Sequence, residues 1–196
     1  MFNQLRPAIS MIVLFTGVLG VAYPLAVTGV AQTVFPAQAN GSLIRDDSGQ
    51  VVGSALVGQS FTSDAYFHPR PSAAGDGYDA SSSSGSNLGP LNEDLAQRVS
   101  DTAAELNAEN AAASIPADAV TTSASGLDPH VSPQNAALQI SRIARARGVS
   151  EGDVRAVLGN HIEGRTFGLL GQPRVNVLLV NRALDARFGR KVSQGT

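Results

Sequence analysis

The chain has 196 residues, with 14 basic against 16 acidic side chains, and it contains no cysteine. The missing cysteine excludes disulfides, thiolate metal sites and cysteine nucleophiles, and the near balance of charge gives no electrostatic case for nucleic-acid binding. The length suits one domain of ordinary size beside a membrane anchor.

The first long stretch, residues 8–34, carries no charged side chain. About 20 mostly apolar residues let an α-helix cross a bilayer core, and a proline such as Pro24 is tolerated in a membrane helix. Ala37-Gln38-Ala39 has the small-x-small form of a signal-peptidase site, so a cleaved signal peptide is the alternative. We expect residues 1–36 to be a retained transmembrane anchor, because the apolar run is about twice the length of a signal core.

The charges around this run predict its orientation. Arg6 precedes the apolar run, and no further charged residue follows before Arg45. Basic residues stay on the cytoplasmic side, so we expect a cytoplasmic N-terminus in the cytoplasmic (inner) membrane. Residues 37–196 would then form one soluble extracytoplasmic domain.

The start of that domain resembles a small sheet. Two β-prone runs, 42–45 and 50–53, flank a turn rich in Asp and Gly, which predicts a hairpin with Gly49 at a positive φ. Residues 54–61 could continue the sheet. Residues 62–90 are rich in Ser, Gly and Pro, and their composition alone leaves a disordered linker and an ordered functional loop equally open.

Helices dominate the remainder, and the domain is therefore predicted as α+β with a small N-terminal sheet and about four helices. Apolar spacing and capping residues predict helices over four ranges, 91–106, 132–148, 150–159 and 176–188, capped at their starts by Ser132, Ser150 and Asn176 in the last three. A short strand is predicted over Ala119–Thr122. A strand over Val175–Val180 competes with the last helix, but the apolar stripe that persists to Phe188 favours the helix.

No catalytic or metal-binding constellation stands out. The three histidines lack a second histidine at helical metal-pair spacing, and no Gly-x-Ser-x-Gly or phosphate-loop motif is present. Asp128-Pro129-His130 could orient a general base, although shaping the turn before Ser132 is the simpler interpretation. Arg142, Arg145 and Arg147 crowd one helix, where we expect a solvated face rather than an anion site.

Motifs along nearly the whole chain resemble one family, the C subunit of the bacterial Kdp-type potassium-transporting P-type ATPase. The segments that carry this resemblance are Tyr23-Pro24-Leu25, Ala39-Asn40-Gly41-Ser42, Gly58-Gln59-Ser60-Phe61, Tyr66-Phe67-His68-Pro69-Arg70-Pro71, Ser86-Asn87-Leu88-Gly89-Pro90, Ser125-Gly126-Leu127-Asp128-Pro129-His130-Val131-Ser132-Pro133 and Gly171-Gln172-Pro173-Arg174-Val175-Asn176. The resemblance favours an ordered surface over residues 62–90.

The family implies a complex that uses ATP to drive potassium uptake. Its other members are a channel-like potassium-binding subunit, an ATP-hydrolysing P-type subunit and a small single-span subunit. The C subunit is implied to be non-catalytic, without a cofactor of its own, and needed for assembly and activity. It is described as a catalytic chaperone that raises the pump subunit's affinity for ATP.

That last role conflicts with an extracytoplasmic domain, because ATP is cytoplasmic. Either the effect travels through the channel-like subunit, or the domain contacts nucleotide directly, in which case Ser125, Gly126 and Gln139 are the candidate residues. A different class, an anchored extracytoplasmic hydrolase that uses His130 and a nearby serine, remains the alternative.

Overall fold

The structure is a computed structural model, and it describes residues 2–109 and 114–190. The chain forms two compact units, Met1–Ser54 and Ala55–Thr196. The first unit therefore contains both the apolar helix and the hairpin that follows it. The second unit holds the α+β head.

The first unit is built on one long helical stretch, Leu5–Val34, which has 30 residues, a mean hydropathy of 2.0 over an 18-residue window and no buried residue. At about 1.5 Å per residue it extends about 45 Å, more than the roughly 30 Å of a bilayer core. Its parts are α1 (Leu5–Phe15), a π-helical segment (Thr16–Ala22) and α2 (Tyr23–Val34), preceded by a short 3₁₀ turn (Phe2–Gln4). This helix is the one candidate membrane span in the described residues.

The position of the π-helical segment follows from Pro24, which lies just after it in the sequence. Pro24 has no N–H to donate to the carbonyl of Gly20, one turn earlier, so the regular i to i−4 ladder cannot continue there. The wider turn of Thr16–Ala22 precedes that gap. Two glycines, Gly17 and Gly20, lie inside the segment.

The predicted hairpin is confirmed. After the short helix α3 (Pro36–Ala39), β1 (Leu43–Arg45) pairs antiparallel with β2 (Val51–Ser54). The turn is fastened by the Asp46 carboxylate, which accepts hydrogen bonds from the backbone N–H groups of Ser48 and Gln50 at 3.0 and 2.9 Å. Gly49 has the expected positive φ, 83°. The continuation of the sheet through Phe61 is wrong, because β2 ends at Ser54 and the chain turns there.

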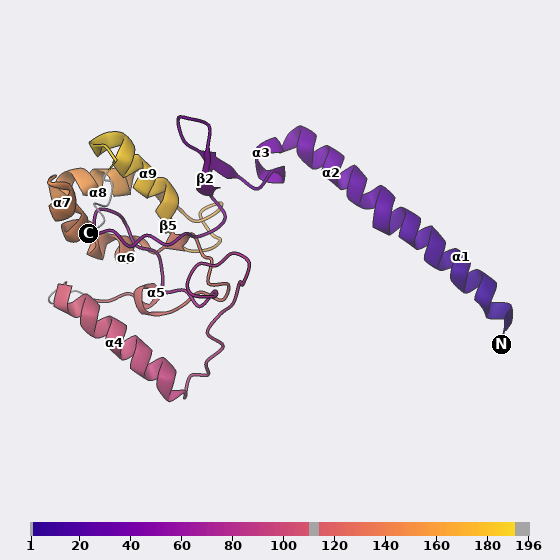
Figure 1. The fold of residues 1–196 in the computed structure, drawn as a ribbon, viewed down its shortest axis with the longest axis horizontal. Helices are drawn as coiled ribbons and strands as arrows, with labels where there is room; N and C mark the ends of the chain where they lie inside the picture. Colours follow the sequence, from indigo (N-terminus) through magenta and orange to yellow (C-terminus); the bar gives the residue numbers. More distant parts are fainter. Residues whose placement is uncertain (1, 110–113, 191–196) are drawn as a thin grey trace. The chain divides into compact units, whose positions relative to one another are not determined.

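The second unit contains helices and a three-stranded antiparallel sheet in the order β3-β5-β4. Its elements are α4 (Glu93–Glu109), α5 (Ala117–Val120), β3 (His130–Val131), α6 (Pro133–Leu138), α7 (Ile140–Arg147), α8 (Glu151–Gly159), β4 (Ile162–Glu163), β5 (Arg174–Asn176) and α9 (Val177–Phe188). Figure 1 shows α7, α8 and α9 gathered near α6 and β5, with α4 apart from that group. The predicted α+β class is confirmed.

The core lies between the sheet and helices α6 to α9, and it is almost entirely aliphatic. One aromatic side chain, Phe67, enters it from the loop over residues 62–90 (the long loop) and is fully buried. The other buried members are Val131, Ala136, Ile140, Ile143, Ala144, Val154, Val157, Leu158, Val175, Val177, Val180 and Leu184.

The predicted helix starts are confirmed by their caps. The Ser132 and Ser150 hydroxyls accept hydrogen bonds from backbone N–H groups three residues on, at 3.0 and 3.1 Å. The Asn176 carboxamide does the same for α9 at 3.2 Å. Gly148 ends α7 with a φ of 69°, the left-handed conformation in which glycine is favoured.

Two helix predictions need correction. The single helix expected from Ser132 to Gly148 is broken at Gln139, which separates α6 from α7. The strand expected over Ala119–Thr122 is instead the helical turn α5, which follows Pro116. Its Asp118 carboxylate accepts hydrogen bonds from the Ser132 N–H and hydroxyl at 2.7 and 2.8 Å, so a tertiary contact overrides local strand propensity.

The loop over residues 62–90 is ordered although it contains neither helix nor strand. The Asn181 carboxamide accepts from the Phe67 N–H at 2.7 Å and donates to the Phe67 carbonyl at 2.9 Å. Gln139 holds His68 in the same way, at 2.7 and 3.1 Å. These two amide clamps fix the loop where Phe67 enters the core, as the family resemblance implied.

The expected solvated arginine face is wrong for two of its three members. The Arg142 side chain is only 16% exposed. The Arg147 side chain is fully buried, and its guanidinium donates to the Asp185 carboxylate at 2.8 Å and to the carbonyls of Ala65 and Gly189. The same Asp185 accepts from the Tyr66 hydroxyl at 3.0 Å, and the guanidinium lies 4.8 Å from the Tyr66 ring centre. Arg147 therefore joins the long loop to α9.

Candidate functional site: a polar pocket beside Arg70

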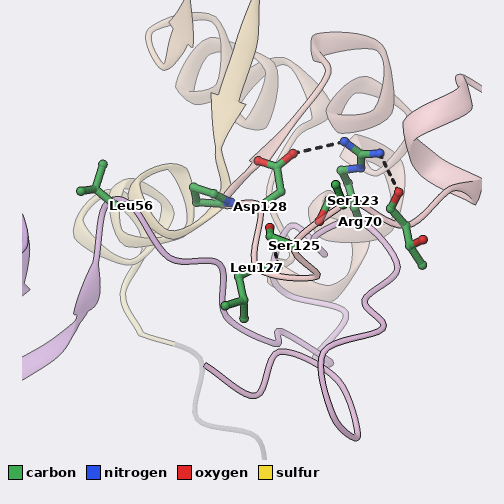
Figure 2. A pocket seen from close by; sticks show the side chains of 9 residues that line it. Leu56, Arg70, Ser123, Ser125, Leu127 and Asp128 are labelled. Carbon is green, nitrogen blue, oxygen red and sulfur yellow. Dashed lines mark hydrogen bonds and ion pairs between the residues drawn. The ribbon is translucent and has the colours of Figure 1, made fainter. Parts of the chain in front are cut away.

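A pocket of about 470 Å³ lies in the second unit, between the long loop and the segment that leads into β3. Figure 2 shows its lining side chains, which come from three parts of the sequence that fold together. They are Leu56, Arg70, Thr122, Ser123, Ala124, Ser125, Leu127, Asp128 and Pro129.

Hydrogen bonds to its carbonyl oxygens fix the segment 122–129 from three directions. Gly58 donates its N–H to the Leu127 carbonyl at 2.8 Å, and Ser84 donates to the Ser125 carbonyl at 3.0 Å. The Ser72 hydroxyl donates to the Gly126 carbonyl at 2.6 Å. The pocket wall is therefore a preformed surface and not a free loop.

Two glycines permit this close packing. Gly126 has a φ of 67°, and a Cβ there would lie 2.7 Å from the Ala74 Cβ. A Cβ on Gly58 would lie 2.6 Å from the Asp128 carbonyl oxygen. No ordinary Cβ contact is that short, so both positions need glycine.

The Arg70 guanidinium dominates the charge of the pocket. It donates to the Asp128 carboxylate at 3.1 Å and to the carbonyl of Thr122 at 3.3 Å (Figure 2). Both side chains are partly covered, with exposed fractions of 21% and 29%. The positive charge is thus balanced inside the pocket, which leaves little net attraction for an anion.

Asp128 also interacts with the backbone and the ring of His130. Its carboxylate accepts from the backbone N–H of His130 at 2.9 Å and lies 3.4 Å from the His130 Nδ1. Burial by itself would raise the pKa of Asp128, but the hydrogen bonds from His130 and the charge of Arg70 outweigh it and hold the pKa below its usual value. Asp128 is therefore a stable anion that organises the pocket.

Tyr78 holds the backbone of Arg70 in place. Its hydroxyl donates to the Arg70 carbonyl at 2.7 Å. Burial, followed by the nearby charge of Asp128, raises the pKa of Tyr78 well above its usual value, so this hydroxyl remains a hydrogen-bond donor.

The three residues predicted to contact nucleotide lie in different settings. Ser125 is exposed, lines the pocket and accepts a hydrogen bond from the Leu127 N–H at 3.1 Å. Gly126 is buried against Ala74. Gln139 is outside the pocket lining, and both ends of its carboxamide are used, by the His68 backbone and by neighbouring side chains. Of these three residues, only Ser125 has a side chain that lines the pocket.

Asp128 and His130 are in contact, as the sequence predicted, but the contact shapes the turn before Ser132. Asp128 holds the backbone and ring of His130, and in the described part of the chain no serine hydroxyl hydrogen-bonds to that ring. Ser132, the nearest serine in sequence, is committed to capping α6 and to Asp118. Across residues 2–109 and 114–190, no three acidic or histidine side chains gather as metal ligands.

The sequence patterns missed Arg70 as a pocket residue and Tyr78 as the residue that holds the Arg70 backbone. The partner of Arg70, Asp128, is more than 50 residues away in the sequence. The contact between Tyr78 and the Arg70 carbonyl depends on the path of a loop without regular structure. No local periodicity therefore marks either residue. The one available signal was the density of aromatic, proline and histidine residues around Arg70 in an otherwise serine-rich stretch.

Across the residues that the structure describes, one candidate membrane span precedes a small α+β head, the arrangement expected of a single-span membrane protein with a folded head. The sequence model of the KdpC family, described as the K⁺-transporting ATPase c chain, matches residues 5–186. The chain therefore belongs to the KdpC family, the c chain of the K⁺-transporting ATPase.

Curated relatives agree along the full length. The potassium-transporting ATPase KdpC subunit of Caulobacter vibrioides (strain NA1000 / CB15N) is 62% identical over 194 residues, which cover 99% of this chain and 98% of that protein. The KdpC subunits of Myxococcus xanthus and Rhodopseudomonas palustris (strain BisB18) are 56% and 52% identical, over 96% and 95% of this chain and 90% and 99% of their own lengths.

Proposed function

We propose that this chain is a non-catalytic subunit of a high-affinity, ATP-driven potassium uptake complex. The observation that carries the proposal is the match to the KdpC family over residues 5–186, which includes both the candidate span and the head. The balanced charges of the Arg70 pocket support a non-catalytic role, because they form a stable structural ion pair. The partners are a channel-like potassium-binding subunit, an ATP-hydrolysing P-type subunit and a small single-span subunit.

The chain contributes to assembly of the complex and to its affinity for ATP. With the N-terminus in the cytoplasm and the head outside, the head cannot touch cytoplasmic ATP. Its effect on ATP affinity would then be a coupling between sites, transmitted through the conformation of the potassium-binding subunit. The head brings no cofactor to this task, and ATP and potassium are handled by the other subunits.

Complementation tests the role. A strain that lacks this chain should fail to grow when potassium is limiting, and the wild-type gene should restore growth. ATP hydrolysis by the purified complex should require a higher ATP concentration when this chain is absent. Normal growth of the deletion strain would contradict the proposal.

Single-cysteine labelling tests the orientation, since the chain has no cysteine of its own. Ser82 is exposed in the head, and Gln4 is exposed before the candidate span. Ser82→Cys should react with a membrane-impermeant maleimide in intact spheroplasts, whereas Gln4→Cys should react only after permeabilisation. The reverse pattern would place the head in the cytoplasm.

Direct nucleotide contact is the second candidate, and the position of Ser125 in the pocket favours testing it. Nucleotide photocrosslinking to the full chain should then fall in variants of Ser125, Gly126 and Gln139. Crosslinking that survives their replacement by alanine would remove these residues as contacts.

An anchored hydrolase remains the alternative from another class, based on the 3.4 Å approach of Asp128 and His130. His130→Ala discriminates between the two, because a hydrolase would lose its function whereas an accessory subunit would still support growth in low potassium.

A further inference from the structure

Strands β4 and β5 are joined by a hairpin that extends away from the core. The strands pair through Ile162 with Val175 and Glu163 with Arg174, and every residue between them, 164–173, is exposed. We call residues 164–173 the arm. In the sheet order β3-β5-β4, the arm runs from the edge strand β4 into the central strand β5.

The tip of the arm has a defined shape. The backbones of Thr166 and Leu170 exchange two hydrogen bonds, at 2.9 and 3.0 Å, and Gly168 donates to the Arg165 carbonyl at 3.0 Å. Phe167 takes a φ of 55°, which is unusual for a bulky residue and is held by this closed turn. The tip therefore presents its side chains in a fixed arrangement.

Those side chains are apolar and lack cover. Phe167, Leu169 and Leu170 have exposed fractions of 89%, 81% and 63%. Together they expose on the order of 400 Å² of side-chain surface, within the size range of exposed patches on single chains that often prove functional. Because these side chains stay in water, they add little hydrophobic stabilisation to the described head, and their burial by a partner would be favourable.

The arm is also cationic. Arg174, which follows the arm in β5, is paired with Glu163 at 2.9 Å, but Arg165 within the arm meets only the neutral Gln172 carboxamide, at 3.3 Å. Within the described residues no acidic side chain pairs with Arg165. A surface that receives the arm thus needs an apolar pocket and a nearby acidic group.

We propose that the arm docks into an apolar, acid-rimmed pocket on the extracytoplasmic surface of a partner subunit of the potassium pump. This inference rests on the proposed function, which supplies the partner. A fixed aromatic tip beside an arginine is typical of the anchors that dominate protein interfaces, and its rigid shape lowers the entropy lost on docking.

Two other occupants fit less well. A second copy that met the arm through the same patch would place Arg165 near its own counterpart, and residues 164–173 contain no acidic side chain to receive it. A lipid surface takes up apolar side chains of any shape, so it gives no use to a closed turn that holds Phe167 in a strained conformation.

The test uses the full chain co-expressed with the other pump subunits and purified through a tag on this chain in mild detergent. Phe167→Asp and, as a second variant, Leu169→Asp place a charge on the tip. Leu91→Asp is the matched control, because Leu91 is 96% exposed and lies outside the arm, just before α4. All three variants should fold as the wild type does, since each side chain is largely in water.

Both arm variants should recover about tenfold less of the partner subunits than Leu91→Asp or the wild type. Equal recovery from all four would overturn the inference while leaving the proposed function intact. If the wild-type chain itself recovered no pump subunits, that result would contradict the proposed function, and the inference about the arm with it.

A second readout identifies what covers the tip. Thr166→Cys gives the chain a single thiol for an environment-sensitive fluorophore beside Phe167, and it leaves the apolar side chains of the tip in place. In proteoliposomes, shielding of the fluorophore from an aqueous quencher only when the other subunits are present supports a protein pocket. Quenching by spin-labelled lipid with this chain alone would overturn the inference in favour of the bilayer.

Discussion

The buried contact between Arg147 and Asp185 gives the sharpest prediction about the stability of the head. The Arg147 side chain is fully buried, whereas Asp185 is 26% exposed. In Asp185→Ala the guanidinium loses the carboxylate that it donates to, and the hydrogen bond from the Tyr66 hydroxyl to Asp185 is lost as well. A charge would then remain buried without a counter-charge.

Removing one partner of a buried ion pair typically costs about 3–5 kcal/mol. Arg147 keeps two carbonyl acceptors, those of Ala65 and Gly189, at 2.6 and 3.1 Å. These two hydrogen bonds compensate in part, so we expect the lower end of that range, about 3 kcal/mol.

Pulse proteolysis in urea, on the full chain in mild detergent, measures this free energy of unfolding. Glu163→Ala is the matched control, because Glu163 pairs with Arg174 at nearly the same distance while both side chains are more than 40% exposed. The control should lose less than about 1 kcal/mol. A loss for Asp185→Ala no larger than that of the control would refute the reasoning.

Three further outcomes follow from the loop and the pocket. Asn181→Ala should lower the free energy of unfolding by about 2–4 kcal/mol, because the Phe67 N–H and C=O would both be left buried without a partner. Gly126→Ala should cost at least about 1–2 kcal/mol, since its φ is positive and the new Cβ would meet Ala74 at 2.7 Å. Burial, and then the charge of Arg142, lowers the pKa of His68 below 6.5, so the unfolded chain binds this proton more readily. Stability should therefore be full above about pH 6.5 and fall as the pH decreases towards the folded pKa, a slope that His68→Gln should reduce.

Urea midpoints measured across these variants and pH values check all three. An Asn181→Ala protein as stable as the wild type would show that the amide clamp contributes nothing. A Gly126→Ala protein with an unchanged midpoint would contradict the packing at that glycine. A wild-type pH profile identical to that of His68→Gln would remove the histidine as its source.

Local signals in the sequence predicted the helical part of the head well. Ser132, Ser150 and Asn176 cap their helices because capping depends on a side chain and on backbone groups three residues away. The candidate membrane span was equally clear, because length and hydropathy alone define it. These features depend on residues that are neighbours in the sequence.

Features set by distant partners could not be predicted. The break at Gln139 reflects a side chain that bonds to the backbone of His68, and the helical turn α5 is fixed through Asp118 and Ser132. Arg147 was expected on a solvated face, because its partner Asp185 lies 38 residues further on, in another helix. Short strands such as β4 and β5, of two and three residues, carry too little alternation to be detected.

The same limit applies to the candidate site. The family resemblance singled out the segment 125–133, and the structure shows that part of this segment lines a pocket. The roles of Arg70, Tyr78 and Gly58 depend on how a loop without regular structure folds back on that segment. Periodicity carries no information about such a path.

Potassium-stimulated ATP hydrolysis by the purified pump tests the central claim most directly. The other subunits should be assayed alone and after addition of this full chain in detergent, over a range of ATP concentrations. We expect this chain to hydrolyse no ATP alone, and its addition to raise potassium-stimulated turnover and lower the ATP concentration needed for half-maximal rate. Unchanged hydrolysis on addition of a correctly folded chain would contradict its role as a subunit that the pump requires.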